Sequence, residues 1–303
     1  MRINAYIIRD YIRNLFVRSR ILSERIARPL YSFEILDRQR EFSKSKLYLS
    51  PAALPLEPGQ IPEGTVLMLL GKPDEKLMAA RLDLLWTEDT VSMPDLVNAV
   101  SDVFSRFCNW SEELQQCLYA EDPLQALGDC GLPYLHNPVG LYTRSFYVLR
   151  YHESVKAPQY MFFQPEDREN YILEDSINQL VLDQEFLYSW DASGPTIYPD
   201  SNYNGRCLFQ NIRMEGKYTL RLVITEFDSP FRDSDFPILN YMVSFYEQLF
   251  KLRKDIRLNI HPQYLDESLR NCLLHRPLDP VRFQIALDHM CWKRDDTYFC
   301  CDI

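Results

Sequence analysis

The segment CLFQNIRMEGKYTLRLVITE, residues 207–226, decides the fold class of this chain. In its second half, apolar or aromatic side chains occupy every second position, which is the period of a half-buried strand. Glu215 and Gly216 have the composition of a two-residue hairpin turn. We therefore expect two antiparallel strands here. The residues expected to share one face are Tyr218, Leu220, Leu222 and Ile224.

The segments on either side extend this hairpin into a domain. Downstream, Ser234 or Asp235 is suited to cap a helix whose apolar stripe runs to Leu252. Upstream, residues 136–153 (HNPVGLYTRSFYVLRYHE) form two apolar runs around a turn, and residues 165–186 have a helical pattern. We predict an antiparallel sheet with flanking helices over residues 131–255, and hence an α+β chain.

The N-terminal part has the pattern of a small α/β domain over residues 1–93. Apolar residues from Ile8 to Ile26 recur at helical spacing, and Pro29 ends the predicted helix. A strand over residues 31–37 and three further short apolar runs follow. One of these runs, Val66 to Leu70, is apolar throughout, which is typical of a strand covered on both faces.

The next segment, residues 94–130, has a helical period and is predicted to connect two domains. Asn109 and Glu112 have capping-box spacing, so we expect a second helix to start there. Gly128 or Gly131 is expected to stop a third, short helix. At the other end of the chain, residues 256–303 are predicted to form a short helical tail, which is a linker followed by the truncated start of a further domain.

Composition restricts the class of protein. A hydrophobic content of 46% with 25% charged residues is that of an ordinary folded protein, and no apolar run is long enough for a membrane helix. Eight cysteines without C-x-x-C spacing predict reduced thiols and a cytoplasmic protein. The net charge of -10 argues against direct binding of nucleic acid. Residues 1–46 nevertheless hold eleven Lys and Arg against five Asp and Glu, which suits either a solvated helix face or an anionic partner.

Motifs for catalysis or metal binding are missing from the sequence. There is no G-x-G-x-x-G, Walker A, H-E-x-x-H or G-x-S-x-G pattern, and the five histidines are scattered. The acid pair Asp233 and Asp235 lies at a predicted helix start, where carboxylates favour the helix dipole without any catalytic role. We therefore predict no enzyme activity, no cofactor and no metal.

An aromatic and arginine-bearing segment, residues 186–221, is the candidate ligand site. Tyrosine and tryptophan present an apolar body with a polar tip, which suits a small-molecule pocket, and arginine holds anionic groups. A core role for the aromatic side chains is the competing interpretation. The candidate ligand-binding residues are Tyr188, Trp190, Tyr198, Arg206, Phe209 and Arg221.

The order of hairpins and long helices resembles a GAF/PAS-like sensory domain. The segment 96–151 is similar to the N-terminal regulatory region of PucR-type (CdaR-like) bacterial transcription regulators. Its marks are Asn98, Phe104, Trp110, Leu114, Asp129 and Asn137-Pro138, and the tail adds Trp292, Asp296 and Tyr298. The resemblance covers roughly residues 40–303, and it is carried by a pattern of helices and turns without a catalytic motif.

The resemblance implies a sensory region that binds a small-molecule effector and acts as a homodimer. Members of that family bind DNA through a C-terminal helix-turn-helix, which this chain lacks, so DNA binding is expected only through a missing segment. A filled, non-catalytic dimerisation scaffold is the alternative, and an enzyme of unknown type is a third interpretation. The sequence does not identify the effector.

Overall fold

The computed structural model describes most of the first 253 residues and divides them into two compact units. Unit 1 comprises residues 1–120 and 231–241, and unit 2 comprises residues 121–230 and 242–303. The described residues are 3–12, 15–26, 28–36, 41–51, 54, 56–143, 148–152, 188–198, 206–214, 216–253, 270, 271, 274, 275, 283 and 287. The predicted helix at 165–186 and almost all of the predicted helical tail therefore lie outside the described residues. The chain is α+β, as the sequence predicts.

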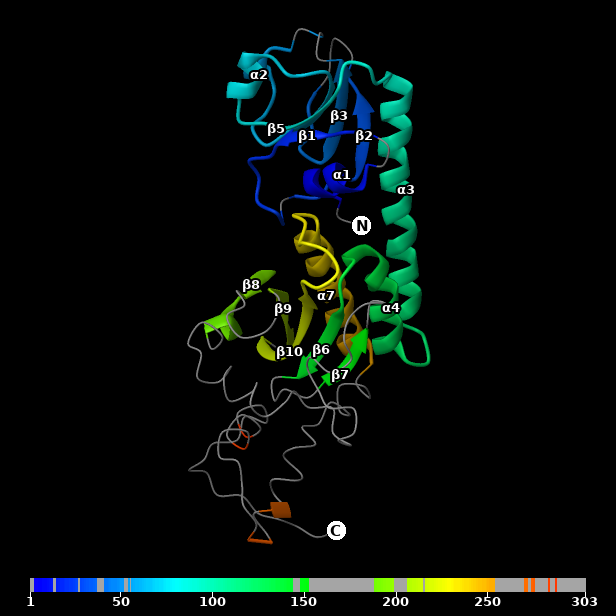
Figure 1. Cartoon of the computed structure of the whole chain (residues 1–303), viewed down its shortest axis with the longest axis vertical. Coiled ribbons are helices and arrows are strands. Elements are labelled where there is room, and N and C mark those ends of the chain that lie inside the picture. The colour runs from blue at the N-terminus through cyan, green and yellow to red at the C-terminus, as the bar shows by residue number, and fades with distance from the viewer. Residues whose placement is uncertain are drawn as a thin grey trace. The chain divides into compact units, whose positions relative to one another are not determined.

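Unit 1 is built on a five-stranded sheet with the order β1-β5-β4-β3-β2 (Figure 1). Strands β2 to β5 pair in parallel, and the short β1 pairs antiparallel with β5. The strands are β1 (Arg18–Arg20), β2 (Ser32–Ile35), β3 (Lys46–Pro51), β4 (Val66–Leu70) and β5 (Asp83–Thr87). Two short helices lie between strands: η1 (Pro58–Gln60), and α2 (Glu75–Ala79), which connects β4 to β5.

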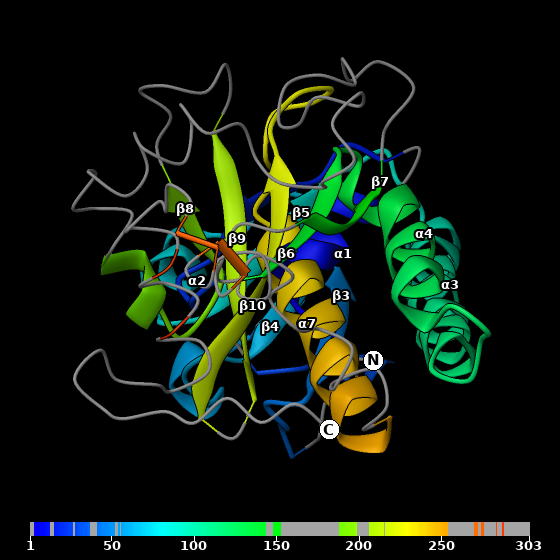
Figure 2. The ribbon, with the colours of Figure 1, turned by 90° about the horizontal axis from the view of Figure 1, so that it is seen from below.

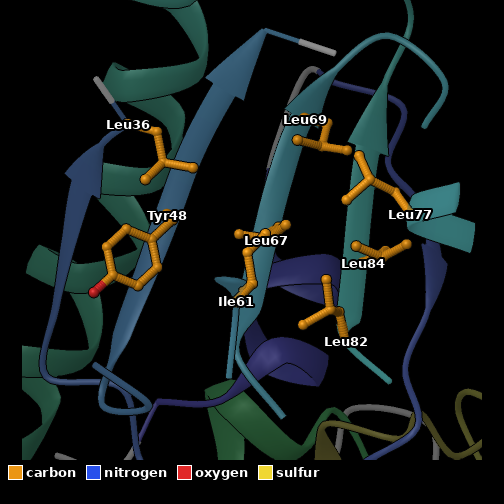
Figure 3. Packing of buried hydrophobic residues seen from close by; sticks show 8 residues of the cluster. All are labelled: Leu36, Tyr48, Ile61, Leu67, Leu69, Leu77, Leu82 and Leu84. Atoms are coloured by element: carbon orange, nitrogen blue, oxygen red, sulfur yellow. The ribbon is translucent and has the colours of Figure 1, made fainter. Parts of the chain in front are cut away.

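The sheet of unit 1 is covered on both faces, as the continuous apolar run of β4 predicts. On one face lies a core cluster that includes Leu77 of α2 (Figure 3). The ribbons of α1 (Ala5–Tyr11) and α3 (Met93–Cys117) lie behind the sheet in that view. On their side, Phe33 of β2 packs on Phe104 of α3 with ring centroids 5.6 Å apart. Alternate residues of the buried strands β3, β4 and β5 thus contribute to two cores.

The helix predicted from Ile8 to Ile26 is wrong beyond its first turns. Helix α1 ends at Tyr11, and residues 18–20 form β1. The reason lies in Asp83, which is buried at the start of β5. Its carboxylate accepts the backbone N–H groups of Leu22 and Ser23 at 2.7 and 3.0 Å and also the hydroxyl of Ser23. These bonds hold residues 22–23 in a turn, so the helical spacing is overridden by a contact 60 residues away in sequence.

Helix α3 is one continuous helix, and the predicted restart at Asn109 is wrong. Ser92 caps its first turn by accepting the N–H of Asp95. The buried stripe continues through Phe107, Trp110 and Leu114 without a change of phase. Because the same face remains buried across residue 109, a capping-box pattern there does not end the helix.

Unit 2 is built on an antiparallel sheet with the order β7-β6-β10-β9-β8 (Figure 1). The strands are β6 (Val139–Thr143), β7 (Val148–His152), β8 (Thr196–Tyr198), β9 (Cys207–Met214) and β10 (Lys217–Thr225). Strands β9 and β10 form the hairpin predicted from residues 207–226, with Gly216 at a φ of 81° in its turn. Strands β6 and β7 form the predicted upstream hairpin.

Helices α4 (Pro123–Leu135) and α7 (Asp235–Leu252) lie on one side of this sheet (Figure 2). The predicted stop of α4 at Gly128 or Gly131 is wrong, because the helix ends at His136, whose φ is 56°. The two glycines instead permit close packing. A Cβ on Gly128 would overlap the His152 ring, and one on Gly131 would overlap the Met242 thioether. Helix α7 starts where the sequence predicts a cap.

Asn137 fixes the entry into the sheet of unit 2. Its side chain is fully buried, and its Oδ1 accepts the backbone N–H groups of Phe227, Asp228 and Ser229 at 3.1, 2.9 and 3.2 Å. Its Nδ2 donates to the carbonyl of Ser229 at 2.9 Å. One amide thus orders the loop between β10 and α7. The predicted domain boundaries at residues 93, 130 and 255 remain predictions.

Candidate functional site

A β-bulge in β10 decides which side chains meet on the sheet of unit 2. Tyr218 pairs with Arg213, but Leu220 pairs with Ile212, so Thr219 is an extra residue in β10. Since successive residues alternate in direction, one extra residue moves everything on one side of the bulge to the opposite face. Tyr218 therefore shares a face with Arg221, and the prediction that it lies with Leu220, Leu222 and Ile224 is wrong. We call this the Arg221 face.

Arg221 is a buried cation at the centre of that face, with 5% of its surface exposed. Its guanidinium carbon lies 4.2 Å from the ring centroid of Phe209 and 5.3 Å from that of Tyr218. Its Nε donates to Asn211 Oδ1 at 2.9 Å, and its Nη2 donates to Ser189 Oγ at 2.9 Å. The charge is thus stabilised by dipoles and by the faces of two aromatic rings.

The segment that carries Ser189 is fastened across the Arg221 face by two strand residues. Asn211 Nδ2 donates to the carbonyl oxygens of Ser189 and Trp190 at 2.8 and 3.1 Å. Arg213 Nη2 donates to the same Trp190 carbonyl at 3.0 Å. The Trp190 ring lies 6.2 Å from that of Tyr218. The short helix η2 (Ser189–Asp191) is therefore positioned by polar groups of β9.

Burial dominates the electrostatics of this face. It lowers the pKa of Arg221, and Tyr218 and Cys207 act in the opposite direction. On β6, Tyr142 pairs with Arg221, and burial raises the pKa of its phenol well above the ordinary value. The Tyr142 ring folds back over Gly140, where any Cβ would collide with it. For both Arg221 and Tyr142, burial on this face therefore favours the neutral form over the charged form.

The six sequence-predicted site residues do not form a single group. Phe209 and Arg221 are in contact, and Trp190 joins them through Tyr218. Tyr198 of β8 pairs with Cys207 of β9 and lies toward the same face by register. Tyr188 is 76% exposed. Arg206 forms an exposed bidentate ion pair with Glu226 at 2.6 Å, which removes it from this group.

Sequence reasoning missed three members of the cluster: Ser189, Asn211 and Tyr218. The amide of Asn211 inside a predicted strand is a usable signal, because asparagine is depleted in strands and a buried amide needs partners. Ser189 gives no such signal, since it acts through a loop that only the fold brings to Arg221. The alternation of apolar residues predicts Tyr218 on the opposite face, because this sequence pattern does not reveal the bulge. We call Arg221, Phe209, Tyr218, Asn211 and Ser189 the buried-arginine cluster.

Within the described part of the chain, no group of three His, Cys, Asp or Glu residues is arranged to hold a metal ion. The same residues include no helix long and apolar enough to cross a membrane. Among them, the four cysteines Cys108, Cys117, Cys130 and Cys207 are not joined by disulfide bonds. Comparison of the chain with models of known protein families and with curated proteins finds no match.

Proposed function

We propose that this chain is the sensory region of a PucR-type transcription regulator and that unit 2 binds a small anionic metabolite at the buried-arginine cluster. The observation that carries the proposal is the burial of Arg221 between two aromatic rings. Burying a guanidinium costs free energy, and a packed apolar side chain in its place is often as stable or more so. A cation retained under those conditions is a candidate for binding an anionic group.

The chemistry of the cluster suits a flat, acidic ligand. A guanidinium offers a planar set of donors that matches a carboxylate, while Phe209, Tyr218 and Trp190 supply ring faces for an unsaturated body. A ligand carboxylate would add a full opposite charge where Asn211 and Ser189 now supply dipoles. In this proposal, the signal passes to a DNA-binding element outside the described residues, and the protein acts as a dimer in the cytoplasm.

The test is a thermal-shift and calorimetric screen of anionic metabolites, including purine-derived acids, dicarboxylates and sugar acids. A ligand present at about 100 times its Kd stabilises the protein by about 2.7 kcal/mol. We expect one of the screened compounds to raise the melting temperature of the wild type. The same compound should act equally on the control variant Arg206→Ala, in which an exposed arginine is removed. Arg221→Met should abolish this effect, and Arg221→Lys should weaken it because lysine lacks the planar fork.

Two results would overturn the proposal. One is a screen in which no compound stabilises the wild type at saturating concentration. The other is a ligand that stabilises the wild type and Arg221→Met equally, which would leave the cluster as a filled, structural core of an interaction scaffold. Circular dichroism of each variant shows whether it is folded, and Arg221→Lys keeps the test valid if Arg221→Met does not fold.

A further inference from the structure

Unit 1 contains a polar groove that the proposed function does not use. The groove has a volume of about 700 Å³, which lies within the range of small-molecule sites. One wall is a face of α3, where Asp95, Asn98, Asp102 and Arg106 follow one another at helical spacing. The opposite wall contains Tyr11 at the end of α1, and α1 and α3 lie side by side in Figure 1.

Apolar side chains make up the other part of the groove lining. Tyr11 is buried, and its ring packs edge-on against Phe107 with centroids 4.8 Å apart. Val103 is also buried and lines the groove beside it. Leu15 and Val91 complete the apolar surface. A ligand with an apolar portion therefore finds a preformed surface to cover.

The charges along α3 have opposite signs at a short distance. Asp95 is already engaged by Ser92, whose hydroxyl donates to its Oδ2 at 2.5 Å. Asp102 is exposed, and none of the described residues forms a hydrogen bond or ion pair with its carboxylate. Arg106 places its guanidinium carbon 5.1 Å from the Tyr11 ring centroid. The four-residue step from Asp102 to Arg106 corresponds to a rise of about 6 Å along the helix.

This spacing matches a zwitterion whose two charges are close together. In an α-amino acid, the ammonium nitrogen and the carboxylate carbon are about 2.5 Å apart. A charged hydrogen bond of about 2.8 Å at each end extends the span to about 8 Å, which exceeds the backbone rise of about 6 Å between the two residues and lets one zwitterion reach both side chains. A dicarboxylate fits worse, because two carboxylates of α3 face it against one guanidinium.

We propose that this groove binds an α-amino acid, with its ammonium group on Asp102, its carboxylate on Arg106, and its side chain against Tyr11, Leu15 and Val91. The site is separate from the buried-arginine cluster, and it selects a zwitterion where that cluster selects an anion. The chain would then respond to two chemically different small molecules.

The test is isothermal titration calorimetry of the full chain with the standard amino acids. For the best binder, the N-acetyl derivative removes the cation and the amide derivative removes the anion, and each should bind at least ~10-fold more weakly. Asp102→Asn and Arg106→Gln should weaken binding at least ~10-fold as well. Glu112→Gln on the same helix and Arg81→Gln, both exposed and outside the groove, should bind like the wild type.

The proposal is overturned if no amino acid binds the wild type at millimolar concentration. It is also overturned if binding persists unchanged in both Asp102→Asn and Arg106→Gln, or if Glu112→Gln weakens it as much as they do. The Arg221→Met variant separates this proposal from the first. Amino-acid binding that survives Arg221→Met but not Asp102→Asn supports the groove, whatever the anion screen shows.

Discussion

The most informative perturbation of unit 1 is Asp235→Asn at the start of α7. The Asp235 side chain is 2% exposed, and its Oδ2 accepts the backbone N–H of Arg232 at 2.8 Å. Its Oδ1 is buried, and none of the described residues forms a hydrogen bond with it. Burial, together with the charges of Asp10 and Asp233, raises the pKa of this carboxyl from 3.8 to about 7, although the contacts with Arg232 act in the opposite direction.

The sign of the pH dependence follows from the direction of this shift. Because the folded-state pKa lies above the unfolded value, the folded state binds the proton more tightly. The stability that this proton contributes is present below pH 3.8 and is lost as pH rises through about 7. A shift of about three pKa units corresponds to about 4 kcal/mol, which is the cost of ionising Asp235 in the folded protein.

Asparagine reproduces the neutral carboxyl and cannot ionise. Its amide oxygen can keep the bond from Arg232, while its NH₂ takes the place of the protonated Oδ1. We therefore expect Asp235→Asn to match the wild type near pH 4 and to be more stable by up to about 4 kcal/mol at pH 8. Urea denaturation of both proteins at a series of pH values measures this difference, and contributions from all other groups cancel in it.

Asp233→Asn is the matched control, because this neighbouring acid is ion-paired. Asp233 accepts from Arg9 Nη2 at 3.0 Å and from Arg25 Nε at 2.8 Å. Its loss should destabilise the protein by about 1 kcal/mol at neutral pH, which is the opposite sign. A difference between Asp235→Asn and the wild type that stays constant from pH 5 to pH 8 would refute the reasoning. So would a variant that is less stable than the wild type at pH 8.

Three further substitutions test the packing of unit 2 by urea denaturation. Asn137→Ala should cost about 3 kcal/mol, because three backbone N–H groups lose their buried acceptor; a cost below about 1 kcal/mol would contradict this. Gly128→Ala should cost about 1–3 kcal/mol through overlap with His152, and the cost should shrink in the His152→Ala background. Arg206→Ala should change stability by less than about 1 kcal/mol, since its ion pair with Glu226 is exposed, and a larger loss would show a hidden role.

The strands of the fold were predictable because their signals are local. The apolar run of β4 and the alternation of β10 follow from burial on two faces or one, and the two strands form where these patterns predict them. The turn at Glu215–Gly216 is likewise encoded in two residues. Helix boundaries were less predictable. The turn at Leu22 and Ser23 depends on Asp83, and the glycine inside α4 at position 128 is explained by the close ring of His152. Neither partner is near in sequence.

The first segment illustrates how charge acquires meaning only in the fold. Its excess of arginine was compatible with a solvated face or an anionic partner. Arg9 and Arg25 both bind Asp233, and the Arg25 guanidinium also lies 4.2 Å from the ring centroid of Phe236. At least two of the arginines therefore have an internal anionic partner at the residues that precede α7. Composition alone does not distinguish that partner from an external one.

The membership of the candidate site depends on a single backbone residue. In a regular strand, Tyr218 and Arg221 would point in opposite directions, because residues an odd number of positions apart lie on opposite faces. The extra residue at Thr219 reverses that parity and brings an aromatic ring onto the guanidinium. The alternation of β10 therefore predicts the strand correctly while assigning Tyr218 to the wrong face. For a sheet-borne site, the chemistry can be inferred from sequence only as far as the first bulge, since each bulge exchanges the sets of side chains that meet.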